Sequence, residues 1–321
     1  MPIMNEVHDI MKQNHLLASV ILRNALSELC SRYIQMEVVM ENHFNAPAEA
    51  VEQNIKACHN KANLPLGKMI LLGIMAGAFI AIGGATSNTA VHNIDNVGLA
   101  RVLAGAIFPV GLMMIVFVGG ELFTGNGLII MCVLDKRATW KQLVRNLVIV
   151  YFSNLIGALL IDCLILLCGN LDYSNGLLGA YTIKVAVGKV AISPLKGFTS
   201  GILCNILVCL AILMATTATD IEGKVWAIFF PIWAFVVGGF EHCVANMFYI
   251  PAGIMAAANP TYVAKAQEAY GITQKQLDSL TVLNSLHNFI PVTLGNLLGG
   301  MLFVGIPCFL VYKKNWAAKN K

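Results

Sequence analysis

This sequence has little charge. Only 12% of its 321 residues are Asp, Glu, Lys or Arg, about half the share that covers the surface of a soluble domain. Hydrophobic residues make up 57%. From Leu66 onward, long apolar stretches alternate with short polar connectors. This composition excludes an ordinary soluble domain and indicates a chain whose solvent is the lipid bilayer.

Signs of a metal site, an enzyme or a nucleic-acid partner are also lacking. The nine cysteines show no metal-binding spacing, and most lie in or beside apolar segments, where cysteine behaves as a small hydrophobe. The net charge of +4 gives no footprint for nucleic acid. No nucleophile–base pair emerges. We therefore expect no metal, no cofactor and no enzymatic activity.

Six stretches reach the roughly 20 apolar residues that a membrane-spanning helix needs. They are residues 66–90, 99–135, 143–169, 195–217, 225–258 and 288–312. The second and fifth are too long for one span, and each has a carboxylate at its centre, Glu121 and Glu241. Irregular backbone at that depth persists only where it is buried in protein or lines a cavity. The sequence predicts an all-α membrane protein with six transmembrane helices, helices 2 and 5 being broken.

The two halves of the chain share a pattern. The heptapeptide NLIGALL, from Asn154, matches NLLGGML, from Asn296, and Gly-Gly precedes both breaks, from Gly119 and Gly238. Because each copy holds three spans, an odd number, the copies must cross the membrane in opposite directions. This predicts a 3+3 inverted repeat with its site at the interface between the copies.

Outside the channel domain at 66–314, we predict a cytoplasmic N-terminal helix at 40–65 and a cytoplasmic tail at 315–321. Residues 1–39 are an extension without spanning length. The codons before Met40 can hold a purine-rich GGAGGT, so we hypothesise that translation begins there; a cytoplasmic helix lying on the membrane is the alternative for this extension.

Basic residues predict the orientation. They crowd the connector after the second span and the segment after the sixth, at Lys136, Arg137, Lys141, Arg145, Lys313, Lys314, Lys319 and Lys321. We therefore expect a multi-pass protein of the cell membrane with both termini cytoplasmic.

Four motifs carry a resemblance to a known family. They are GELFTG at 120–125, Lys189 upstream of CNILVCLA at 204–211, GFEH at 239–242 followed by Asn246, and NFIPVTLGN at 288–296. Together they resemble the formate/nitrite transporter family over Met40 to Lys314. The resemblance implies an aquaporin-like protomer, a homopentamer in the bilayer, and one pore per subunit for a small anion and protons.

A central histidine is the first candidate of the pore. His242 is the only histidine within a predicted span and lies at a break. Histidine titrates near neutrality and can exchange a proton with a passing weak acid; a buried histidine that merely bonds a backbone carbonyl is the alternative. The resemblance implies that His242 partners Thr124 and that Lys189, in the loop before the fourth span, draws anions toward it.

Carboxylates and amides near the breaks form a second group. Glu121 and Glu241 invite a proton-relay interpretation, but an acidic lining would repel an anion. We expect each carboxylate to fix the backbone of its own break by accepting N–H groups. Four asparagines are expected to satisfy backbone or bridge the copies: Asn205, Asn246, Asn288 and Asn296. The resemblance implies that Asn205 and Asn288 lie near the permeation route.

Apolar side chains are the third group. The resemblance implies that Phe108 and Phe235 narrow the outer side of the pore and Leu112 and Leu122 the inner side, with Phe123 also in the constriction. A bare anion pays several kcal/mol to cross such a ring unhydrated, and a neutral acid far less. We therefore predict proton-linked passage of a weak-acid anion.

Formate is the expected substrate because the connector from Tyr249 to Leu280 resembles the formate branch. The region from Ala191 to Lys196 departs from that branch, so nitrite and hydrosulfide stay open. A neutral-solute channel of the aquaporin type is an alternative from another class. It should carry Asn-Pro-Ala at both breaks, whereas Asn259-Pro260 occurs only in a connector.

Overall fold

A computed structural model describes residue 20, residues 22–31 and residues 44–313. The hypothesis about Met40 and the predicted tail at 315–321 lie outside these residues. The chain divides into two units, Met1–Phe44 and Asn45–Lys321. In the first, residues 22–31 are helical. The second unit holds the predicted channel domain.

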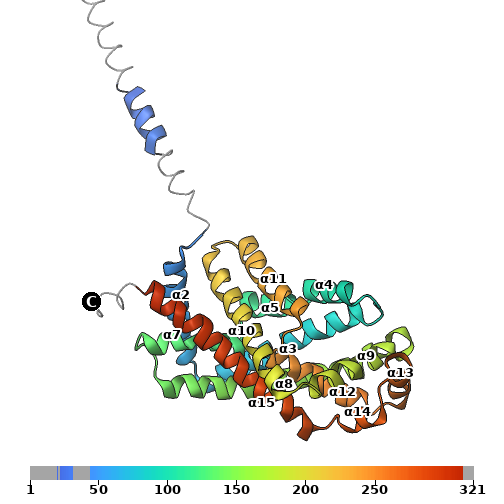
Figure 1. The fold of residues 1–321 in the computed structure, drawn as a ribbon. Helices are drawn as coiled ribbons and strands as arrows, with labels where there is room; N and C mark the ends of the chain where they lie inside the picture. The colour runs from blue at the N-terminus through green and yellow to red at the C-terminus, as the bar shows by residue number, and fades with distance from the viewer. Residues whose placement is uncertain (1–19, 21, 32–43, 314–321) are drawn as a thin grey trace, which may run out of the picture. The chain divides into compact units, whose positions relative to one another are not determined.

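The second unit is built from helices (Figure 1). In chain order they are α2 Pro47–Ala62, α3 Leu66–Val91, α4 Val97–Ile107, α5 Val110–Val118, α6 Phe123–Asn126, α7 Ile129–Leu134, α8 Trp140–Leu167, α9 Tyr173–Val190, α10 Pro194–Thr217, α11 Ile221–Gly238, α12 Cys243–Ala256, α13 Pro260–Tyr270, α14 Gln274–Asp278, α15 Val282–Gly300 and α16 Ile306–Tyr312. Among the described residues, six spans are long and apolar enough to cross a membrane: Leu66–Val91, Val97–Val118, Trp140–Leu167, Pro194–Thr217, Ile221–Gly238 and Val282–Tyr312. The predicted all-α fold with six membrane-spanning segments is confirmed.

Both predicted breaks are present. Residues 119–122 separate α5 from α6, and residues 239–242 separate α11 from α12. Gly119 and Gly239 take φ angles of 103° and 68°, a left-handed backbone that glycine adopts without steric cost. Helices 2 and 5 are therefore broken as predicted, each at the glycine that directly follows its first half.

Two features differ from the sequence prediction. The stretch before the fourth span, expected as a loop, forms helix α9, because Leu178, Ile183 and Val187 are buried against α12 and α13. The second span is also interrupted at Pro109, between α4 and α5. Proline has no N–H to continue the helical hydrogen bonds.

Helix pairs approach each other closely at matching glycines. A Cβ on Gly157 of α8 would lie 1.9 Å from the carbonyl oxygen of Ile74 in α3. A Cβ on Gly299 of α15 would lie 2.3 Å from that of Ile202 in α10. These glycines belong to the two copies of the NLxG pattern. The matching contacts support the inverted repeat, and the opposite orientation of its halves stays a prediction.

Two helices outside the six spans lie at opposite ends of α3. Helix α2 immediately precedes its first turn. At its other end, His92 Nε2 lies 2.8 Å from Ser174 Oγ of α9. We call these ends the α2 side and the α9 side.

Candidate functional site

The two breaks meet at a histidine and a threonine. His242 ends the break before α12, and Thr124 lies in α6, directly after the other break. His242 Nε2 lies 2.9 Å from Thr124 Oγ1, and both residues are buried. The structure thus joins two residues that are 118 positions apart in the sequence.

The first turn of α12 fixes the tautomer of this histidine. The backbone N–H of Ala245 donates to His242 Nδ1 over 3.0 Å. Because Nδ1 accepts, the neutral ring carries its proton on Nε2, which donates to Thr124 Oγ1. The Thr124 hydroxyl keeps its own hydrogen to donate elsewhere. An imidazolium would place a second N–H against that of Ala245 and lose the helix cap.

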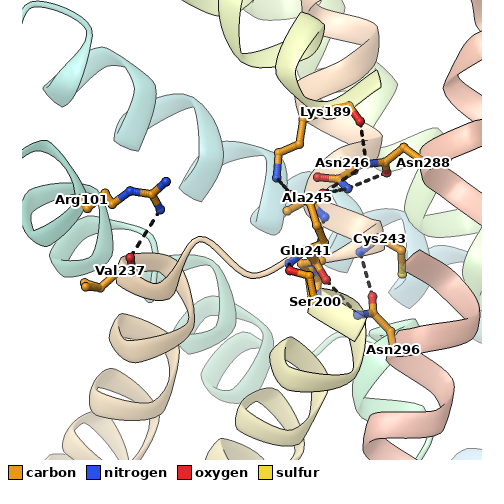
Figure 2. Close-up of polar contacts among 11 residues, drawn as sticks. Arg101, Lys189, Ser200, Val237, Glu241, Cys243, Ala245, Asn246, Asn288 and Asn296 are labelled. Atoms are coloured by element: carbon orange, nitrogen blue, oxygen red, sulfur yellow. Dashed lines mark hydrogen bonds and ion pairs between the residues drawn. The ribbon is translucent and has the colours of Figure 1, made fainter. Parts of the chain in front are cut away.

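A buried ion pair lies beside this centre on the α9 side (Figure 2). Lys189 Nζ of α9 donates to Glu241 Oε1 over 2.7 Å. Asn246 and Asn288 donate to Glu241 Oε2 over 2.7 and 3.2 Å, and Asn288 also donates to the Lys189 carbonyl over 3.0 Å. The structure pairs the Lys189 ammonium group with the Glu241 carboxylate, and the expectation that Lys189 draws anions toward His242 stays a prediction.

A matching cluster lies at the other break. Lys61 Nζ at the end of α2 lies 3.3 Å from Glu121 Oε1 and donates to Asn126 Oδ1 over 3.0 Å. Asn126 donates to Glu121 Oε2 over 2.6 Å and to Asn146 Oδ1 over 2.8 Å. Asn146 donates to the Lys61 carbonyl over 3.1 Å. Each break therefore holds one lysine, one glutamate and two asparagines.

Sequence reasoning missed Lys61 and Asn146. A signal for Asn146 was available, since it precedes Asn154 by eight residues and Asn288 precedes Asn296 by the same interval. Lys61 gave no comparable signal. It lies 60 residues before Glu121, whereas Lys189 lies 52 residues before Glu241, so only the fold brings it to its partner.

The backbone of each break is held by asparagines and not, as expected, by the glutamates. Asn154 accepts from the Phe123 N–H over 2.9 Å and donates to the Glu121 carbonyl over 2.9 Å. Asn296 accepts from the Cys243 N–H over 2.8 Å and donates to the Glu241 carbonyl over 2.9 Å. Amides can do this because they both donate and accept, whereas a carboxylate only accepts. The glutamates instead bind the lysines and asparagines.

Asn205 of α10 links α6 to α15. Its Nδ2 donates to the Thr124 carbonyl over 3.2 Å and to the Asn296 carbonyl over 2.6 Å. The expectation that Asn205 bridges the halves or satisfies backbone therefore matches its contacts.

A cavity of about 740 Å³ opens on the α9 side of the centre, and Phe108, Phe235 and His242 are among its lining residues. The rings of Phe108 and Phe235 meet edge to face with centroids 5.5 Å apart, and Phe235 lies 5.9 Å from the His242 ring. The remaining constriction candidates, Leu112, Leu122 and Phe123, lie in the buried apolar core. The structure thus brings Phe108, Phe235 and His242 together.

A known protein family matches most of this sequence. The family model described as formate/nitrite transporter matches residues 48–310. A probable formate transporter of Methanothermobacter thermautotrophicus is 37% identical over 293 residues, covering 86% of this chain and 100% of that one. The formate channel FocA of Escherichia coli strain K12 is 37% identical over 250 residues, covering 76% and 86%.

Solved structures agree with these relatives. A pentameric formate channel with formate bound matches with a TM-score of 0.70 at 36% identity, covering 78% of this chain and 98% of that one. An FNT family ion channel matches with a TM-score of 0.68 at 27% identity, covering 84% and 98%. This chain belongs to the formate/nitrite transporter family of membrane channels and transporters, and it is not an enzyme.

Proposed function

We propose that this protein conducts formate, the anion of a small weak acid, through a pore in which passage is linked to a proton at His242. The observation that carries the proposal is the hydrogen bond between His242 and Thr124, which joins the two breaks at one buried point. The choice of formate as the substrate is supported by the formate channels among the similar proteins. Nitrite and hydrosulfide are the alternatives within the family.

The apolar surroundings explain why a proton is needed. Beside His242 the route is narrowed by the buried rings of Phe108 and Phe235. An unpaired anion loses its hydration there at a cost of several kcal/mol, whereas the neutral acid loses much less. Transport of the acid, or of an anion together with a proton, therefore has the lower barrier.

His242 couples the binding of a proton to the binding of an anion. Its imidazolium form loses the hydrogen bond that the Ala245 N–H donates to Nδ1. It also lies at the positive end of the α12 dipole, which disfavours a positive charge. An anion beside the ring offsets both costs by stabilising the positive charge. The proton and the anion therefore favour each other's presence, which makes flux depend on the proton gradient.

The ion pairs at the two breaks prepare the site without opposing the anion. Lys189 with Glu241 and Lys61 with Glu121 each carry no net charge. Their lysines hold the carboxylates that bind Asn246 and Asn126, and each asparagine is the fourth residue after its break. We assign them a positioning role.

We further propose that the protein forms a homopentamer in the cell membrane with both termini cytoplasmic. A pentameric formate channel among the similar structures supports the assembly, and the basic connectors support the orientation. Native mass spectrometry of the purified protein tests the pentamer, because a monomer or another closed ring contradicts it.

Proteoliposome flux tests the substrate and the proton link. His242→Asn is the sharpest variant, since asparagine is a good helix N-cap and replaces only the imidazole's chemistry. His287→Asn, at an exposed position on α15, is the matched control. We expect formate uptake to rise with an inward proton gradient in the wild type and the control, and His242→Asn to lose this dependence.

The outcomes are distinct. A His242→Asn variant with the wild-type pH profile would remove the imidazole from the mechanism. Wild-type liposomes that move nitrite or hydrosulfide and exclude formate would refute the substrate while leaving the proton link to be measured on the other anion.

A further inference from the structure

The cavity on the α9 side is lined by several charged side chains, and not all of them have a role in the proposed pore. Its lining includes the cations Arg101, Lys184 and Lys189 and the carboxylates Asp95 and Glu241. Because Lys189 and Glu241 neutralise each other, the remaining lining carries two positive charges against one negative. The cavity therefore favours an anion for reasons independent of His242.

Arg101 of α4 reaches over the second break (Figure 2). Its Nη1 donates to the Val237 carbonyl over 3.4 Å. A Cβ on Gly239 would lie 2.2 Å from the same nitrogen, so the glycine of the break makes room for the guanidinium. A guanidinium has five N–H groups, and among the described residues only Val237 accepts from that of Arg101, so the others can bind a second acceptor.

Lys184 of α9 is held by aromatic rings. Its Nζ lies 4.3 Å from the centroid of the Tyr270 ring and 5.5 Å from that of Tyr181. Both tyrosines line the cavity. Ring faces attract an ammonium group without cancelling its charge. They also offer apolar surface to a ligand beside that charge.

A third group is an orphaned amide. Asn88 near the end of α3 lines the same cavity and is only 6% exposed. Within the described residues its Nδ2 has no hydrogen-bond partner. A buried donor without an acceptor costs about 1–3 kcal/mol. Nδ2 itself has almost no accessible surface, so a turn of the Asn88 side chain toward the cavity would let an anion relieve that cost.

We propose that Arg101, Lys184 and Asn88 form a docking site for monovalent carboxylates and sulfonates on the α9 side of the Phe108–Phe235 pair. The cavity of about 740 Å³ holds on the order of 25 waters at about 30 Å³ each, so formate fills a small part of it. The site thus accepts anions with an apolar body that are too large for the constriction.

Benzenesulfonate is the test ligand, because it stays charged at every working pH and cannot cross as a neutral acid. It is present on both sides of proteoliposomes during formate uptake. We expect competitive inhibition: the apparent KM for formate rises and the maximal rate is unchanged. Arg101→Gln, Lys184→Gln and Asn88→Leu should each raise the inhibition constant about fivefold.

Two variants serve as controls. Lys275→Gln removes the same charge from α14, outside the cavity lining, and should leave inhibition at the wild-type level. Arg101→Lys keeps the charge and should retain most of the inhibition, which separates loss of the cation from a folding defect in Arg101→Gln.

The inference rests on the proposed function only in using anion flux as its readout. If nitrite or hydrosulfide carries the flux, the same inhibition is measured on that anion, so a wrong substrate does not decide the result. Intact flux without inhibition overturns the docking site. Inhibition that is equally strong in all three cavity variants overturns it as well.

Discussion

The matching ion pairs at the two breaks allow a comparison, within one protein, of how burial changes the contribution of an ion pair to stability. The Lys189 and Glu241 side chains are 19% and 7% exposed, with the charged atoms 2.7 Å apart. Those of Lys61 and Glu121 are 32% and 5% exposed, 3.3 Å apart. The perturbation is the same in both, lysine to methionine, which keeps an unbranched side chain, one atom shorter, and removes its charge.

The structure sets different magnitudes for the two variants. Removing one partner of a buried pair costs about 3–5 kcal/mol, because the remaining charge is left uncompensated. Lys189→Met should approach this figure, since Glu241 retains only amide donors. At the more exposed Lys61, solvent replaces part of the lost interaction, so Lys61→Met should cost about 1–2 kcal/mol.

Thermal unfolding of the detergent-purified protein measures the difference. The Lys189→Met variant should melt roughly 10 °C below the wild type, if each kcal/mol corresponds to about 2–4 °C. The double variant Lys189→Met/Glu241→Gln should recover much of this loss, because no charge is then left unpaired. Equal losses in Lys61→Met and Lys189→Met, or no recovery in the double variant, would refute this reasoning.

Two further predictions concern packing and pH. Gly157→Ala should destabilise the protein by more than the usual 1–3 kcal/mol of overpacking, because the added Cβ would lie 1.9 Å from the backbone of α3. The control Gly67→Ala, whose Cβ would have nothing within 4 Å, should be neutral or slightly stabilising. Equal melting temperatures for the two variants would contradict the close helix packing. Burial raises the pKa of Glu52, but hydrogen bonds from Lys313 and Arg137 outweigh it and lower the pKa below its ordinary value. The contribution of Glu52 is therefore present above the unfolded pKa of about 4.3 and disappears as pH falls through the lower folded value. Unfolding of wild type and Glu52→Gln should differ by up to about 1 kcal/mol at pH 7 and converge at acidic pH; a difference that persists there would exclude the carboxylate as its source.

Much of the architecture was predictable because the bilayer imposes strict rules on sequence. A span needs about 20 apolar residues, so the six segments stand out. A carboxylate within such a segment is costly, so Glu121 and Glu241 indicate the breaks from the sequence alone. The Gly-Gly pairs and the NLxG pattern indicate two related halves, and the inverted repeat stays a prediction.

The sequence was less informative about polar partners. It could not distinguish the asparagines that hold the backbone from the glutamates that bind lysines, because both residue types accept hydrogen bonds. No motif in the sequence singles out Lys61 or Arg101. Their partners, Glu121 and the Val237 carbonyl, lie 60 and 136 residues away, a separation that no local pattern encodes.

By itself the sequence determined that the chain spans a membrane six times, that two spans are broken, and which family it resembles, because hydropathy and motif are local properties of the chain. Only the tertiary structure decided which side chains meet at the breaks, that Lys189 is neutralised by Glu241, and that α9 is a helix. Those outcomes depend on packing between distant segments, where a hydrogen bond or an ion pair forms only if the fold brings both partners within about 3 Å.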